Sequence, residues 1–107
     1  MMEFDLVALR TFVTVCETGN LTAAGRLLGM TQAAISQRIK KLENEVRARL
    51  IDRDLRPIQL TPTGQLVYER ARVILAEAGR LDADLLERSH LPLPELRLGV
   101  ADSLGST

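Results

Sequence analysis

The first 46 residues contain three amphipathic segments that are joined by very short turns. The segments span residues 6–18, 21–28 and 31–46, and each repeats apolar side chains at the three- and four-residue spacing of one helical face. Each segment begins beside a residue that can cap a helix, in order Asp5, Asn20 and Thr31. Helices connected this closely must bury their apolar faces against one another, so we expect a mainly α-helical domain.

Residues 50–60 break the helical period and alternate instead. This stretch is short, with a polar tip from Asp52 to Arg56 and alternating apolar residues at Ile58 and Leu60, which predicts a small two-stranded hairpin. Pro57 confines such a hairpin to an edge, since proline has no N–H to donate to a ladder.

A long helix is predicted after the hairpin. Thr61-Pro62 is a strong helix start, and no further proline occurs before Ser89. Apolar residues recur along this helix at heptad spacing: Val67, Ala71, Ile74, Ala78, Leu81 and Leu85. So narrow a seam on so long a helix predicts pairing with a second helix, and therefore a homodimer. The alternative is that the helix folds back on the core of its own chain.

The last residues indicate a second domain of which only the start is present. The Leu91–Pro94 stretch breaks the helix, and Glu95–Val100 alternates like a strand that has nothing to pair with. We therefore expect a domain over 1–60, a linker helix over 61–90, and over 91–107 a hinge with the first strand of a truncated domain.

The chain carries no net charge, but its charges are unevenly distributed. Residues 21–60 hold eight Lys and Arg against four Asp and Glu, a net of +4, while the rest of the chain is acidic. Nucleic acid responds to the local charge of a contact surface, so neutrality of the whole chain does not exclude it. The single cysteine, Cys16, and the absence of a long apolar run favour a cytoplasmic protein outside the membrane.

Residues 21–39 match the requirements of a helix-turn-helix. Gly25 is small where two helices would cross, Gly29 suits the turn, and Ile35 points into the core. In this motif the second helix enters the major groove of DNA. Its outward positions are Thr31, Gln32, Ala33, Ser36, Gln37 and Lys40. Gln, Ser and Ala can contact base edges, whereas Thr31, Arg38 and Lys40 are suited to phosphates.

Several motifs resemble the amino-terminal part of LysR-type transcriptional regulators. They are Leu21-Thr22-Ala23-Ala24, Thr31-Gln32-Ala33-Ala34-Ile35-Ser36, Leu42-Glu43 and Leu60-Thr61-Pro62-Thr63-Gly64. The resemblance implies a winged helix-turn-helix, with three helices plus a small β-hairpin wing, followed by a long dimerisation helix.

The resemblance also implies which residues contact double-stranded DNA. The base contacts fall on Gln32, Ala33, Ser36, Gln37 and the wing residue Arg56. The phosphate contacts fall on Thr22, Thr31, Lys40 and Arg53, to which the residue pattern adds Arg38.

Partners follow from the same resemblance. The linker helices of two subunits would pair antiparallel, the operator would be a partial palindrome, and the full-length protein would form a tetramer. A small-molecule effector would bind only in the missing domain, and no cofactor is implied.

Four positions depart from the family pattern. Ala33 stands where proline is frequent, Arg47 where a helix-ending glycine is usual, Ile51 where phenylalanine is common, and Asp54 where glycine often forms the wing tip. The first departure alters base contacts, and the others bear on the path of the chain into and around the wing.

Other functions find less support. A helical protein-interaction module that uses the heptad helix without DNA is the alternative. An enzyme is not indicated, since no nucleophile with a base, no carboxylate pair and no phosphate loop is evident. Cys16 falls on an apolar face and is expected in the core. His90 has no ligand-type neighbour at metal spacing, so no metal is expected.

Overall fold

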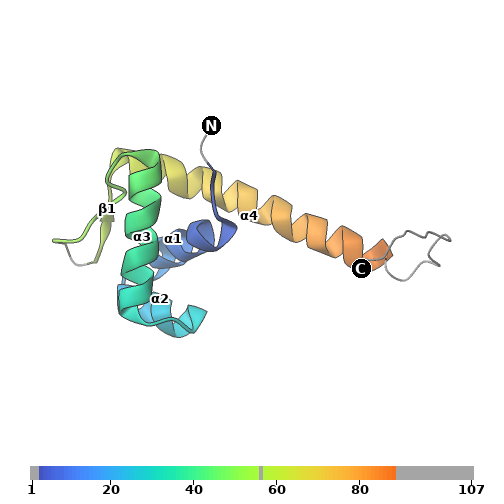
Figure 1. The fold of residues 1–107 in the computed structure, drawn as a ribbon, viewed down its shortest axis with the longest axis horizontal. Coiled ribbons are helices and arrows are strands. Elements are labelled where there is room, and N and C mark those ends of the chain that lie inside the picture. The colour runs from blue at the N-terminus through green and yellow to red at the C-terminus, as the bar shows by residue number, and fades with distance from the viewer. Residues whose placement is uncertain (1–2, 56, 89–107) are drawn as a thin grey trace. The chain divides into compact units, whose positions relative to one another are not determined.

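The computed structural model describes residues 3–55 and 57–88, which form a small helical domain with a hairpin and a long fourth helix (Figure 1). The elements follow the chain as α1 (Leu6–Thr18), α2 (Leu21–Leu28), α3 (Gln32–Val46), β1 (Ile51–Asp52), β2 (Gln59–Leu60) and α4 (Pro62–Arg88). The winged helix-turn-helix architecture expected from the sequence is confirmed.

The three predicted caps begin the first three helices. The Asp5 carboxylate accepts from the Val7 N–H (2.8 Å), the Asn20 amide oxygen from the Ala23 N–H (3.0 Å), and the Thr31 hydroxyl from the Ala34 N–H (3.0 Å). Each bond satisfies an N–H that has no partner within its helix.

The helices α1, α2 and α3 pack around one apolar core. Its largest members are completely buried, and they come mainly from α1 and α3: Phe12, Val15, Ile35, Ile39 and Leu42. Cys16 packs at the edge of this core, as expected. Burial, with a smaller contribution from the adjacent Glu17 carboxylate, raises the pKa of the Cys16 thiol to about 12, so the thiol stays protonated at neutral pH.

The predicted hairpin is present as a two-residue ladder. β1 and β2 are antiparallel, with Ile51 opposite Leu60 and Asp52 opposite Gln59. The Asp52 carboxylate accepts from the Asp54 N–H (3.1 Å), an interaction typical of a turn. Asp54 therefore enters the wing tip without the positive φ that a glycine would offer.

Arg47 ends α3 in the left-handed conformation, with φ 59°. This conformation is the one that a helix-ending glycine adopts without steric cost. The Arg47 and Ala48 N–H groups both donate to the Glu43 carbonyl, so the helix ends in the usual way. The path of the chain is kept although glycine is absent.

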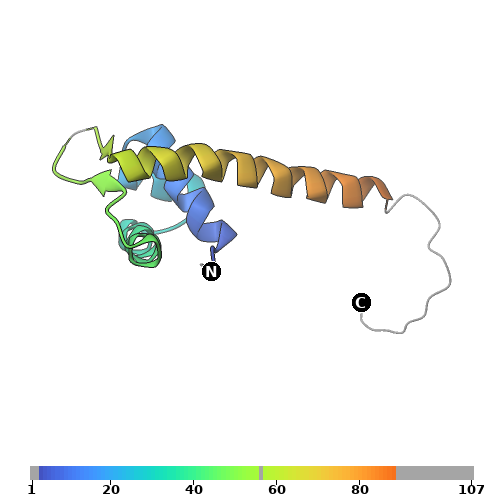
Figure 2. The same ribbon diagram turned by 90° about the horizontal axis from the view of Figure 1, so that it is seen from above.

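The first part of α4 packs on the domain that precedes it. Ala71 is buried in the core, and Val67 and Leu75 lie against it. Figure 2 shows α1 passing across this part of α4, where the Tyr68 hydroxyl donates to the Glu17 carboxylate over 3.4 Å. For Val67, Ala71 and Leu75, the alternative is therefore correct in which the helix packs on the core of its own chain.

The later part of α4 belongs to a separate packing unit. Among the described residues, packing contacts divide the chain inside α4, after Glu77. None of the helices in the described residues is both long and apolar enough to cross a membrane. The strand and hinge expected over 91–107 lie outside the described residues.

Candidate nucleic-acid interface

A tight turn connects α2 to α3. Gly29 ends α2 with φ 67°, and the Met30 N–H donates to the Gly25 carbonyl (2.9 Å). A Cβ on Gly25 would lie 2.5 Å from the Met30 carbonyl oxygen. A small residue is therefore required at Gly25, as predicted, but its closest neighbour is the turn itself rather than the facing helix.

The surface of α3 carries the residues predicted to contact DNA. Ile35 and Ile39 are fully buried, which turns the opposite side of the helix outward. Of the predicted base-reading positions, Gln32, Ala33 and Gln37 are exposed and Ser36 is half-buried. Thr31 and Lys40, predicted to contact phosphates, are exposed beside them. These side chains thus share one outward surface.

Arg38 differs from the other predicted phosphate contacts. It is half-buried, and its guanidinium lies 4.0 Å from the carboxylate of Asp5, the residue that caps α1. This ion pair places Arg38 at the junction of α3 with α1, so any phosphate has to compete with Asp5 for its guanidinium.

A small pocket brings together three predicted contacts from three elements. Thr22, Gln32 and Arg53 line a space of about 220 Å³ together with residues of the α1–α2 turn and Ile58. The Thr22 hydroxyl donates to the Gln32 side-chain oxygen over 3.5 Å. The start of α2, the start of α3 and the wing therefore meet at one surface depression.

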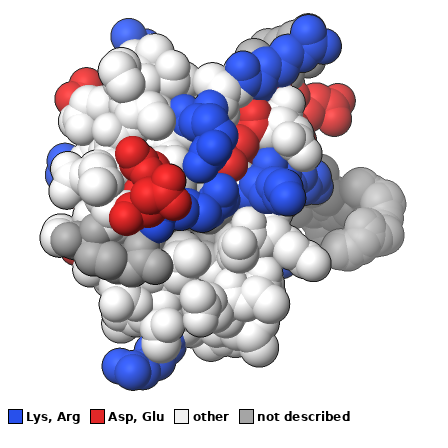
Figure 3. Space-filling view, turned by 90° about the vertical axis from the view of Figure 1, so that its left-hand side faces the viewer, with Lys and Arg blue, Asp and Glu red and all other residues white. Residues whose placement is uncertain are grey.

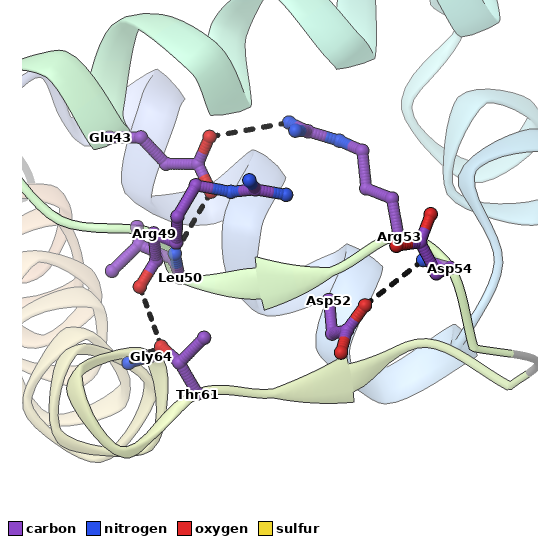
Figure 4. A network of polar contacts seen from close by, with 8 residues as sticks. All are labelled: Glu43, Arg49, Leu50, Asp52, Arg53, Asp54, Thr61 and Gly64. Atoms are coloured by element: carbon purple, nitrogen blue, oxygen red, sulfur yellow. Dashed lines mark hydrogen bonds and ion pairs between the residues drawn. The ribbon is translucent and has the colours of Figure 1, made fainter.

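Glu43 organises the region between α3 and the wing, as Figure 4 shows. Only 7% of Glu43 is exposed. One carboxylate oxygen accepts from the Leu50 N–H (2.9 Å) and lies 3.8 Å from the Arg49 Nε. The other oxygen accepts from the Arg53 guanidinium (3.4 Å). A buried carboxylate with these partners fixes the start of the wing relative to α3.

Sequence reasoning missed this role of Glu43 and treated the residue only as a family landmark. A signal was present, because Glu43 follows Ile39 by one helical turn and so falls on the inward side of α3. An inward carboxylate followed by a basic stretch predicts an internal ion pair.

A second set of hydrogen bonds connects the wing to α4. The Thr61 hydroxyl donates to the Arg49 carbonyl (2.6 Å) and accepts from the Gly64 N–H (2.9 Å), while the Thr61 N–H donates to the Leu50 carbonyl (3.0 Å). Gly64 approaches so closely that a Cβ would collide with the Leu50 carbonyl oxygen. The glycine is thus required by the contact between α4 and the strand entrance.

Basic side chains gather on the side of the molecule formed by α3 and the wing. Figure 3 faces this side and shows Lys and Arg across its middle, with Asp and Glu among them. Arg53, a predicted phosphate contact, is 30% exposed at its side chain and shares its guanidinium with Glu43. Arg56, the predicted wing contact, lies outside the described residues.

The predicted dimer seam on α4 divides into two parts. Val67 and Ala71 belong to the core of their own domain and Ala78 is half-buried, whereas Ile74, Leu81 and Leu85 are 41%, 59% and 56% exposed. Large apolar side chains so open to water are typical of surfaces that bind a partner.

Within the described ranges, no group of His, Cys, Asp and Glu side chains could hold a metal ion. His90 lies outside those ranges. The site consists of hydrogen-bonding and basic side chains on a helix, a turn and a wing.

Comparison with known proteins identifies the family. The family model described as "Bacterial regulatory helix-turn-helix protein, lysR family" matches residues 6–65. The chain is 34% identical over 99 residues to the HTH-type transcriptional activator AaeR of Escherichia coli K12, covering 92% of this chain and 32% of that protein. It therefore spans about a third of the length of this curated relative.

Comparison with solved structures leads to the same family. The crystal structure of Vibrio fischeri DarR in complex with DNA matches with a TM-score of 0.80 and 33% identity, over 86% of this chain and 32% of that one. The BenM DBD in complex with catB site 1 DNA matches with a TM-score of 0.77 and 30% identity, over 84% of this chain and all of that one. The chain therefore belongs to the lysR family of bacterial regulatory helix-turn-helix proteins.

Proposed function

We propose that this chain binds double-stranded DNA in a sequence-specific manner, as the DNA-binding part of a dimeric transcriptional regulator. The observation that carries the proposal is the surface of α3, where exposed Gln, Thr and Lys side chains stand opposite a fully buried apolar stripe. A helix held rigidly by its core with short polar side chains outward is suited to the major groove. The DarR and BenM structures contain DNA, which supports the same function here.

In this proposal Gln32, Ala33, Ser36 and Gln37 contact base edges. The hydrogen bond from Thr22 to Gln32 limits the rotamers of the Gln32 side chain and so favours one orientation of its amide toward a base. Thr22, Thr31, Arg38, Lys40 and Arg53 contact phosphates. Arg56 enters the adjoining minor groove, an assignment that rests on the family resemblance.

Dimerisation is proposed to occur through the exposed part of α4. Ile74, Leu81 and Leu85 supply the apolar contact, and pairing of two helices sets the distance between two recognition helices. The operator is then a partial palindrome, because a two-fold dimer reads two half-sites.

Further proposals concern the longer protein to which this chain corresponds. Residues 91–107 begin a domain that binds a small-molecule effector, and the full-length regulator forms a tetramer in the cytoplasm. The relatives are named as transcriptional regulators rather than enzymes, and we propose a binding function without catalysis.

The test begins with selection of an operator from a random duplex library by the unmodified chain. Gln32→Ala should then cost about 1–3 kcal/mol of binding free energy on the selected duplex and little on random DNA. Gln65→Ala is the matched control, since Gln65 is an exposed glutamine that belongs to α4 and not to α3.

Equal losses on both duplexes would refute the base-reading role of Gln32. Failure of the unmodified chain to bind any duplex would refute the proposed function and favour a protein-interaction module.

A further inference from the structure

The outward surface of α3 continues beyond the proposed base-reading residues. Ala33, Gln37, Lys40, Asn44 and Arg47 follow one another at alternating spacings of four and three residues, and all five are exposed. Residues at this spacing lie along one side of a helix. The outward row of α3 therefore extends to Asn44, and Arg47 follows directly after the last residue of the helix.

This row is longer than the groove that it would occupy. At 1.5 Å per residue, Ala33 and Arg47 lie about 21 Å apart along the helix axis. The major groove is about 12 Å wide. A helix that crosses the groove with its start on base edges can therefore bring its far end close to the sugar-phosphate backbone at the groove edge.

The far end of α3 borders a basic cleft. The cleft has a volume of about 620 Å³ and lies between α3 and the segment that leads into β1. Its charged lining consists of Lys40, Arg47, Arg49 and Arg53 around a single carboxylate, that of Glu43.

The charges of the cleft are not balanced within the domain. Glu43 is engaged by the Leu50 N–H, Arg49 and Arg53. Across the residues that the structure describes, Lys40 and Arg47 form no ion pair with a carboxylate. The cleft thus keeps an excess of positive charge, with four basic side chains around the one carboxylate of Glu43.

The backbone at Arg47 adds a second observation. Arg47 holds φ 59°, a conformation that costs energy for any residue with a Cβ. A glycine would end α3 there at no such cost. An arginine thus ends α3 at a position where glycine would cost less, and its side chain lines the cleft.

We propose that this cleft binds a backbone phosphate of duplex DNA beside the half-site that α3 reads, with Arg47 and Arg49 as donors and Lys40 at its rim. Glu43 is a positioning residue, because its carboxylate orients Arg49 and Arg53 toward the same cleft. The inference rests on the proposed DNA-binding function. It adds Arg47 and Arg49 to the phosphate contacts Lys40 and Arg53 that the family resemblance already implies.

The experiment compares two substitutions that keep the Cβ and the backbone cost at Arg47. Arg47→Gln removes the charge and Arg47→Lys retains it. Arg10→Gln, on an exposed arginine of α1, is the control for the change in net charge. Binding to a mixed-sequence duplex of about 40 base pairs is followed by fluorescence anisotropy between about 50 and 200 mM NaCl.

Arg47→Gln should flatten the slope of log K against log salt by about 0.9 for each protomer bound. Arg47→Lys should restore most of the slope, since an ammonium also binds phosphate. Arg10→Gln should leave the slope unchanged. The urea midpoints of the two Arg47 variants should coincide.

The inference is overturned if Arg47→Gln keeps the original slope, or if Arg10→Gln flattens it equally. The proposed function survives both results provided that Gln32→Ala still loses the selected operator. Absence of duplex binding by the unmodified chain overturns both.

Discussion

The apolar stripes of α3 and α4 have the same spacing in the sequence but opposite surroundings in the structure. In α3, Ile35, Ile39 and Leu42 are completely buried by helices of the same chain. In α4, Leu81 and Leu85 are more than half exposed. Helical periodicity thus identifies which side of a helix is apolar, but not whether its partner lies in the same chain or in another.

The largest expected loss of stability comes from a substitution in the buried stripe of α3. Ile39→Ala should lower the free energy of unfolding by about 3–4 kcal/mol, because it leaves a cavity among close-packed neighbours. Leu85→Ala, at an equally apolar stripe position of α4, should change it by less than about 0.5 kcal/mol under dilute conditions. Urea denaturation followed by circular dichroism measures both, and equal losses would contradict the contrast.

The junction between the two helices should show a smaller effect. Gly64→Ala should destabilise the domain by about 2–3 kcal/mol, because its Cβ meets the Leu50 carbonyl oxygen and forces the backbone apart. Gly79→Ala, also in α4 but with open space around it, should instead stabilise by about 1 kcal/mol. Thermal unfolding of the two variants separates overpacking from helix propensity.

A substitution at the end of α3 should instead increase the stability of the domain. Arg47→Gly should raise the free energy of unfolding by about 1 kcal/mol, since glycine adopts a positive φ without a Cβ clash. Asn44→Gly, one helical turn earlier, should lower it by about 0.3 kcal/mol, because glycine is a poorer helix former than asparagine inside a helix. A loss of stability in both variants would show that the Arg47 side chain stabilises the fold.

The smallest effect on the domain itself is expected from the exposed stripe. Ile74→Glu combined with Leu81→Glu should change the unfolding of the dilute chain by only about 0.5 kcal/mol. The same pair should abolish the proposed dimer in sedimentation and remove the dependence of the unfolding midpoint on protein concentration. Ala76→Glu, exposed on α4 but off the seam, should retain the dimer. A persistent dimer in the double variant would exclude this seam as the interface.

Local signals explain which features were predictable from the sequence. Asp5, Asn20 and Thr31 cap the helices with bonds to residues two or three positions ahead, so their effect can be read without knowing the fold. The outward residues of α3 follow equally from its period. These features depend on neighbours in the sequence.

The features that escaped prediction depend on distant residues. Glu43 contacts Leu50 and Arg53 only because the hairpin folds back on α3, and Gly64 is constrained by a carbonyl fourteen residues earlier. The seam of α4 could not be divided in advance, since Ala71 and Leu85 occupy equivalent heptad positions. Which of them meets the chain's own core is settled by the packing of α1.

The main chain of Leu50 connects two helices, because its N–H and its carbonyl each bind another element. Its N–H is held by Glu43 of α3, and its carbonyl accepts from Thr61 at the start of α4. The first turn of α4 and the helix α3 are therefore joined through the main chain of one residue. For the proposed DNA-bound dimer, substitutions at this joint should alter the preferred separation of two half-sites before they alter the strength of binding to either one.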